Sequence, residues 1–184
     1  MAEPVETPFG TVTAEHFRSG DVCHQVVIGP KFLYALFNPR DRTHSISRAF
    51  MDFVRDGDLP YRRLVVDDHI VDEAATRLEK QASMRQAAAF LTTLGESSFY
   101  QFECVSADVF EEARETFADW TDLDASFTDC VVSAHMADLE IDHILTYDQH
   151  YDAFDVTTLP YRSQDGVRRR SRRRCSDKVQ KLER

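Results

Sequence analysis

Short apolar runs alternate with amphipathic helical segments along this chain, and this alternation constrains its fold more than any other feature. The runs at residues 22–28, 63–66, 102–105 and 143–146 have the length and composition of buried strands. The first three are each followed by apolar side chains at three- and four-residue intervals, as on one face of a helix. A fifth run, at residues 154–159, is expected to be an edge strand. This order predicts an α/β fold, a three-layer α/β/α sandwich around a parallel sheet of four or five strands.

Polar residues and glycines mark the expected ends of the helices. Asp67 and Asp68 stand at the start of one helical segment, and Ser126 at the start of another. Side chains of these types accept hydrogen bonds from the first free backbone N–H groups of a helix. We also expect a helix to begin at Ser83 and to end at Gly95, because glycine commonly follows the last helical residue.

The chain divides into three parts by composition. Residues 1–21 contain two prolines and two glycines with little periodicity, and are expected to form an irregular N-terminal extension. Residues 22–160 hold the alternating pattern and are expected to form one domain. Residues 161–184 include six arginines within the seven positions 168–174, so we expect a basic, disordered tail. Such a tail either stays solvated or binds RNA phosphates.

Charge is distributed very unevenly along the chain. Residues 1–161 hold 12 Lys and Arg against 29 Asp and Glu, and only two of the basic residues, Lys31 and Lys80, are lysines. Dense surface carboxylates are screened in concentrated salt, so this composition indicates a protein that stays soluble in a halophilic cell.

Other sequence features exclude several classes of protein. The four cysteines show no CxxC pair and no histidine at zinc-finger spacing, which favours free thiols in a reducing compartment. The N-terminus lacks the basic and apolar regions of a signal peptide. No apolar run approaches the roughly 20 residues that a membrane helix needs. We therefore expect a cytoplasmic protein that does not enter a membrane.

Acidic residues gather where the expected strands end and the next helices begin. They are Asp67, Asp68, Asp72, Glu73, Asp129 and Asp148. The carboxyl ends of parallel strands meet at one edge of a sheet, where ligands of α/β proteins bind. Crowded carboxylates repel unless a cation neutralises them, and oxygen ligands suit Mg²⁺ or Mn²⁺. Each residue alone also has a simpler explanation, because acidic side chains stabilise helix N-termini.

Three of these positions lie in segments that resemble PIN domains. Residues 64–78, 126–134 and 144–154 are similar to the family segments that carry its second, third and fourth acidic residues. The matching positions are Glu73, Asp129 and Asp148. Residues 32–41 resemble the family's first helix and its exit turn, and the agreement in order and spacing extends over about residues 22–160. Within the family, the layout is nearest to the VapC-like toxins.

The resemblance implies both an activity and a set of partners. PIN-domain toxins are typically Mg²⁺- or Mn²⁺-dependent endoribonucleases that hydrolyse RNA phosphodiester bonds. Glu73, Asp129 and Asp148 are then the catalytic residues and the metal ligands: Asp129 and Glu73 hold the ion, and Asp148 completes its shell or orients the attacking water. The resemblance also implies an RNA substrate, a small antitoxin protein as a partner, and a homodimer.

The chain departs from the family at the first acidic position. PIN domains place an Asp directly after the first strand, where this chain has Gly29, followed by Pro30 and Lys31. Loss of one carboxylate from such a site lowers metal affinity and rate. An alternative from another functional class is therefore a catalytically impaired PIN domain that binds RNA or a protein.

One short segment also resembles a different family. The sequence around Asp67 and Asp68 resembles the start of a response-regulator receiver domain, but no lysine occurs between Lys80 and Lys178 to complete that site.

The histidines of the domain have no metal-site spacing, so packing or surface roles are favoured for them. They are His69, His135, His143 and His150.

Overall fold

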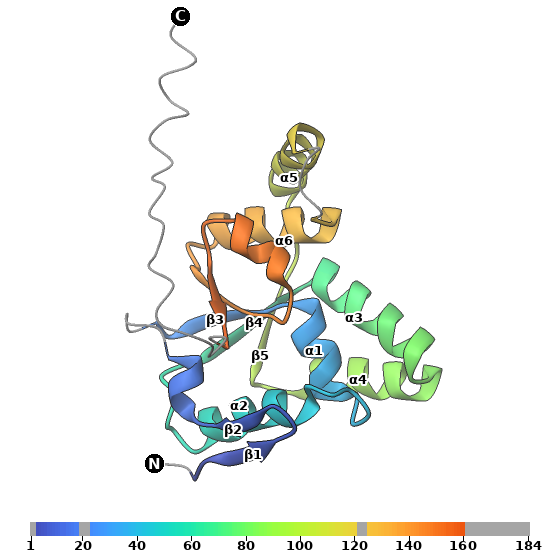
Figure 1. Ribbon diagram of the computed structural model, residues 1–184. Coiled ribbons are helices and arrows are strands. Elements are labelled where there is room, and N and C mark those ends of the chain that lie inside the picture. Colours follow the sequence, from blue (N-terminus) through green and yellow to red (C-terminus); the bar gives the residue numbers. More distant parts are fainter. Residues whose placement is uncertain (1–2, 19–22, 121–124, 161–184) are drawn as a thin grey trace, which may run out of the picture.

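The computed structural model describes residues 3–18, 23–120 and 125–160, and its centre is a five-stranded sheet (Figure 1). The strand order is β5-β4-β3-β6-β7, and every neighbouring pair is parallel. The strands are β3 (Gln25–Ile28), β4 (Arg63–Asp67), β5 (Tyr100–Glu103), β6 (His143–Leu145) and β7 (Thr157–Leu159). The α/β fold with a parallel sheet of four or five strands is therefore confirmed.

Helices join the strands in an order that covers both faces of the sheet. They are α1 (Pro30–Phe37), α2 (His44–Arg55), α3 (Asp68–Gln81), α4 (Met84–Glu96), α5 (Ala107–Asp119) and α6 (Phe127–Asp138). The crossovers from β3 to β4 and from β4 to β5 advance in one direction across the sheet, whereas the crossover from β5 to β6 returns in the other. Because such crossovers are right-handed, the two directions place their helices on opposite faces. Figure 1 shows α5 and α6 at the top of the view, across the strands from α2.

The main core lies between the sheet and its helices. Its centre is a group of aromatic side chains, in which Phe50 of α2 packs against Phe17 and Phe32 with ring centroids 5.2 and 5.7 Å apart. Helix α6 contributes Val132 and Met136 to this core. Its other side packs on α5 in a second, smaller core made by Val109, Ala113, Cys130, Val131 and Ala134. Burial on two sides holds α6 firmly, and α6 carries Asp129.

Most of the expected helix caps are present. Asp67 accepts a hydrogen bond from the backbone N–H of Ile70 at 2.8 Å, and Ser126 accepts one from the N–H of Asp129 at 3.2 Å. The expectation that Gly95 ends a helix was wrong. Helix α4 continues through Gly95 to Glu96, and Ser97 follows in an extended conformation. A side chain at Gly95 would meet nothing within 4 Å, so no close approach requires glycine there.

The N-terminal part has more regular structure than the irregular extension that the sequence suggested. Strands β1 (Val5–Thr7) and β2 (Gly10–Val12) form an antiparallel hairpin, followed by a 3₁₀ helix η1 (Ala14–Phe17). Phe17 is fully buried, and its carbonyl oxygen accepts a hydrogen bond from the Tyr61 hydroxyl at 2.9 Å. Burial of this large side chain ties the segment to the core, and the domain boundary at residue 21 stays a prediction.

The expectation of a disordered tail at residues 161–184 concerns residues outside the described ranges. Within those ranges, no helix has both the length and the apolar character that crossing a bilayer requires.

Candidate metal centre

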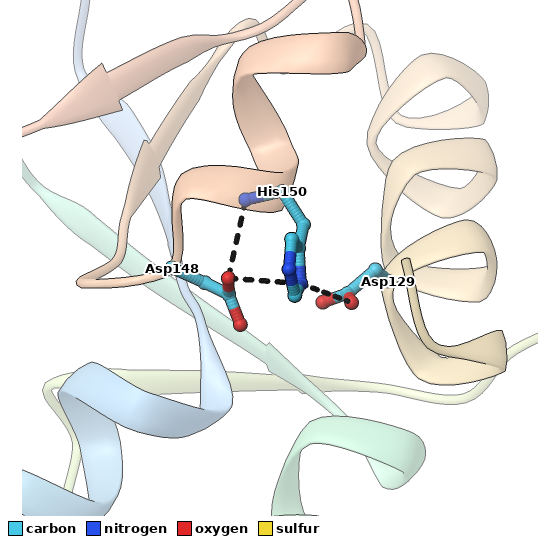
Figure 2. A group of neighbouring side chains, drawn as sticks. All are labelled: Asp129, Asp148 and His150. Carbon is cyan, nitrogen blue, oxygen red and sulfur yellow. Dashed lines mark hydrogen bonds and ion pairs between the residues drawn. The ribbon is translucent and has the colours of Figure 1, made fainter. Parts of the chain in front are cut away.

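Two of the three acidic residues singled out from the sequence meet at the carboxyl edge of the sheet. Asp129 lies in the first turn of α6, and Asp148 follows β6 at the start of the 3₁₀ helix η2 (Gln149–Ala153). Figure 2 shows their carboxylates on either side of the His150 ring. One ligand atom from each of these three residues lies within 4.8 Å of the other two. We call these three residues the rim cluster.

Asp129 is held in place by reciprocal hydrogen bonds with Ser126. Its Oδ2 atom accepts hydrogen bonds from the backbone N–H of Ser126 at 2.9 Å and from the Ser126 hydroxyl at 2.8 Å. The side chain is 7% exposed. The capping box therefore fixes the direction of a nearly buried carboxylate.

Asp148 is also fixed by its local backbone. Its N–H donates to the Thr146 hydroxyl at 2.9 Å, and its Oδ1 accepts from the N–H of His150 at 3.1 Å. The other oxygen, Oδ2, forms an ion pair with the Lys31 ammonium group. Burial by itself raises the pKa of Asp148, but the hydrogen bonds and the charges of Lys31 and His150 outweigh burial and hold this pKa below its usual value. Asp148 is therefore ionised at neutral pH.

His150 is the member of the rim cluster that the sequence did not reveal. Its Nδ1 atom lies 3.0 Å from Asp148 Oδ1 and 3.8 Å from Asp129 Oδ2. The ring is 28% exposed, whereas the next residue, Tyr151, is fully buried and anchors the short helix. The sequence favours surface or packing roles for the histidines, because neither their spacing nor their partners converge. Only the fold brings Asp129 beside it.

Glu73 lies next to the rim cluster but is not one of its three members. It is half-buried on α3. Burial raises its pKa, and the negative charge of Asp129 adds to this effect; a hydrogen bond with Thr128 and the charges of Arg77 and Lys31 oppose it only in part. Glu73 is therefore close enough to Asp129 for their two charges to interact.

Gly29 directly follows β3, at the position that the sequence resemblance matches to the family's first Asp, and the structure leaves little room for a side chain there. Its N–H donates to the Leu145 carbonyl at 2.8 Å. A Cβ atom at Gly29 would lie 3.1 Å from that same oxygen and 3.4 Å from the side chains of Ile144 and Thr146. The backbone has φ −67° and ψ 159°, which any residue adopts. The constraint is therefore the close approach of β6.

The remaining acidic residues at this edge have structural roles or lie to one side. Asp67 is buried, caps α3 and lies 3.1 Å from Nδ1 of His135, which is also buried. Asp68 accepts a hydrogen bond from the N–H of Val105 at 3.1 Å. Helix capping thus explains Asp67 without an active-site role. Asp72 lines an open hollow along α3.

A hollow of about 430 Å³ runs along α3 beside Glu73. Besides Asp72 and Glu73, its lining includes Arg77 and Lys80 on α3 and Thr128 at the start of α6. We call it the α3 groove. Of the two lysines in residues 1–161, one pairs with the rim cluster and the other lines this groove. The groove lining carries two positive side chains, Arg77 and Lys80, and two acidic ones, Asp72 and Glu73.

Comparison with known proteins gives a match at the level of the fold. No family model and no curated protein matches the sequence. Among solved structures, the chain is similar to VapC20 of Mycobacterium tuberculosis, described as a toxin that cleaves the sarcin–ricin loop. The TM-score is 0.61 with 23% sequence identity, over 71% of this chain and 98% of that one. The expected resemblance to the PIN-domain, VapC-like fold is thereby confirmed.

Proposed function

We propose that this chain is a Mg²⁺- or Mn²⁺-dependent ribonuclease that hydrolyses RNA phosphodiester bonds, in the manner of a toxin. One observation carries the proposal: Asp129 and Asp148 converge at the carboxyl edge of the sheet, in a fold similar to that of an RNA-cleaving toxin. Ligands bind at this edge in open α/β sheets.

The residues present fit a divalent cation, although position 29 contributes no ligand. Asp129 and Asp148 offer carboxylate oxygens, which Mg²⁺ and Mn²⁺ prefer, and Glu73 adds a third carboxylate close by. A bound ion supplies Lewis-acid polarisation of a phosphate oxygen and lowers the pKa of a water molecule.

The position of each carboxylate suggests its role in binding the ion. Asp129, fixed by Ser126, and Glu73, which faces it, hold the ion. Asp148 completes the shell or orients the attacking water, and its lowered pKa keeps it ionised for either task. These are the roles that the resemblance to PIN domains implies.

The α3 groove provides a path for the RNA backbone. Arg77 and Lys80 line a hollow that Glu73 and Thr128 also line. Arg77 lies over the Tyr34 ring, 5.0 Å from its centroid, and this contact supports the guanidinium group. Phosphate contacts from such residues supply most of the sequence-independent affinity for RNA.

A second candidate function is an impaired nuclease that binds RNA or a protein without cutting it. Two observations favour it: Gly29 provides no carboxylate, and the Lys31 ammonium already pairs with Asp148. A small antitoxin protein, a second copy of the chain, and a cytoplasmic and halophilic setting remain part of the proposal. They rest on the likeness to VapC-type toxins and on the acidic composition.

Cleavage of a structured RNA in the presence of Mn²⁺ tests the proposal, with Asp129→Asn compared against Asp138→Asn. Both residues lie on α6 and undergo the same chemical change, but Asp138 is exposed in the last turn, away from the rim cluster. We expect Asp129→Asn to lose cleavage by at least about a hundredfold and Asp138→Asn to retain it. A parent protein that binds RNA without cutting it supports the second candidate.

A further inference from the structure

The rim cluster contains an imidazole where a PIN-type site is expected to contain only carboxylates. Nδ1 of His150 lies 3.0 Å from one carboxylate and 3.8 Å from the other. Figure 2 shows the ring between the two aspartates, which come from α6 and from the loop after β6. Three potential ligand atoms from two separate parts of the chain therefore converge, and one of them is nitrogen.

The chain holds this imidazole in position. The backbone N–H of His150 donates to Oδ1 of Asp148, and the neighbouring Tyr151 is fully buried. The turn between Asp148 and His150 is thus closed by a hydrogen bond and anchored by a core aromatic residue. A ligand that is already oriented loses less conformational entropy when an ion binds.

Lys31 divides the two oxygens of Asp148 between different partners. The Lys31 ammonium group, in the first turn of α1, pairs with Oδ2, whereas Oδ1 faces His150. A positive side chain in the first turn of a helix is unfavourable to the helix dipole, and the ion pair offsets this cost. Gly29, directly before the same helix, has no side chain. A Cβ atom at this position would lie 3.1 Å from the Leu145 oxygen.

We propose that His150 is a third metal ligand beside Asp129 and Asp148, that its Nδ1 gives up its proton and its contact with Asp148 when an ion binds, and that it makes the centre prefer Mn²⁺ to Mg²⁺. This inference rests on the proposed function, because it concerns the ion at the same site. Mg²⁺ is a hard cation that binds oxygen and keeps its water molecules, whereas Mn²⁺ accepts nitrogen ligands more readily. The mixed set of two carboxylates and one imidazole therefore selects between the two ions.

Calorimetric titration of the full chain with Mn²⁺ and with Mg²⁺ tests the selectivity. We expect the parent protein to bind Mn²⁺ at least about tenfold more tightly than Mg²⁺. In His150→Asn we expect the Mn²⁺ affinity to fall about ten- to a hundredfold, with a much smaller change for Mg²⁺. The matched control is His24→Asn, since His24 is exposed and precedes β3 at the opposite edge of the sheet.

Pulsed electron paramagnetic resonance of the Mn²⁺-loaded parent protein tests the ligand directly. A coordinated imidazole gives a ¹⁴N coupling to the manganese, which we expect in the parent and in His24→Asn but not in His150→Asn. This measurement on the parent protein decides the question even if His150→Asn does not fold. Absence of the coupling, or equal affinity of the parent for the two ions, overturns the inference.

The two proposals fail in different ways. If the parent shows the nitrogen coupling and the preference for Mn²⁺ but does not cut RNA, the ligand assignment is supported and the nuclease proposal is wrong. If the parent cuts RNA with Mn²⁺ but shows no nitrogen coupling, the nuclease proposal is supported and the role given to His150 is wrong.

Discussion

Two Asp–His pairs lie near the carboxyl edge of the sheet, with almost the same separation but very different surroundings. Asp67 and His135 are 3.1 Å apart, with side chains 3% and 6% exposed. Asp148 and His150 are 3.0 Å apart, with side chains 10% and 28% exposed. The first pair joins the start of α3 to α6, whereas the second faces Asp129 and the Lys31 ammonium group.

Residue types and distances alone therefore do not distinguish a structural pair from a ligand site. In the first pair, Asp67 also caps α3 through Ile70, and both side chains are almost completely buried. In the second pair, a third ligand residue is in reach and solvent has access. We therefore expect the first pair to stabilise the protein and the second to bind an ion.

Replacing the aspartate of each pair should lower the free energy of unfolding by very different amounts. Asp67→Ala should lower the free energy of unfolding by about 3–5 kcal/mol, because it removes one member of a buried pair together with a helix cap. Asp148→Ala should cost less, about 1–2 kcal/mol, because the partners it leaves behind, Lys31 and His150, are 36% and 28% exposed and can be solvated. Urea unfolding of both variants provides the measurement. Equal losses would mean that both pairs are structural.

A smaller effect concerns the competition between Lys31 and the ion for Asp148. Lys31→Gln frees the Oδ2 atom and removes a positive charge from the site, so the affinity for Mn²⁺ should rise about tenfold. Arg85→Gln is the control, because it makes the same change of charge on an exposed part of α4. If Lys31→Gln instead weakens Mn²⁺ binding, the ammonium group supports the site and does not compete for it.

The buried pair of Asp67 and His135 should also make the stability of the protein depend weakly on pH. The hydrogen bond to Asp67 raises the pKa of His135 despite the opposing effect of burial, and the charges of Asp67, Asp138 and Glu103 raise it further. The unfolded chain has the ordinary histidine pKa of about 6.5. The stabilisation is therefore complete below that pH and is lost as pH rises through the folded pKa.

Urea unfolding at a series of pH values checks this prediction. The free energy of unfolding should decrease between about pH 6.5 and the folded pKa of His135, and the decrease should be absent from His135→Gln. A matched His24→Gln substitution should leave the decrease unchanged. A decrease that persists in His135→Gln would assign it to another group.

Local sequence patterns predicted most of the fold. Apolar runs and polar caps placed the strands of the main sheet and the starts of α3, α4 and α6, because these features depend on neighbouring residues. The hairpin β1–β2 was missed because its strands have only three residues each. The burial of Phe17 depends on contacts with distant aromatic residues, which periodicity does not reveal.

The candidate site was predictable only in outline. The rule that strand ends meet at one edge was enough to bring Asp129 and Asp148 together. It did not predict that Asp67 would pair with His135, 68 positions away, or that Lys31 would pair with Asp148. His150 was missed for the same reason, because its second carboxylate comes from another helix. Contacts of this kind depend on how helices pack, which a single sequence does not display.

A crystal structure of the chain grown with Mn²⁺ would show which of the two pairs binds an ion. Anomalous scattering locates manganese independently of how the surrounding residues are interpreted. We predict one anomalous peak bounded by Asp129, Asp148 and His150, with Lys31 no longer paired with Asp148, and no peak beside Asp67 and His135. A peak at the buried pair, or no peak at the rim cluster, would contradict the division of the two pairs into structural and metal-binding.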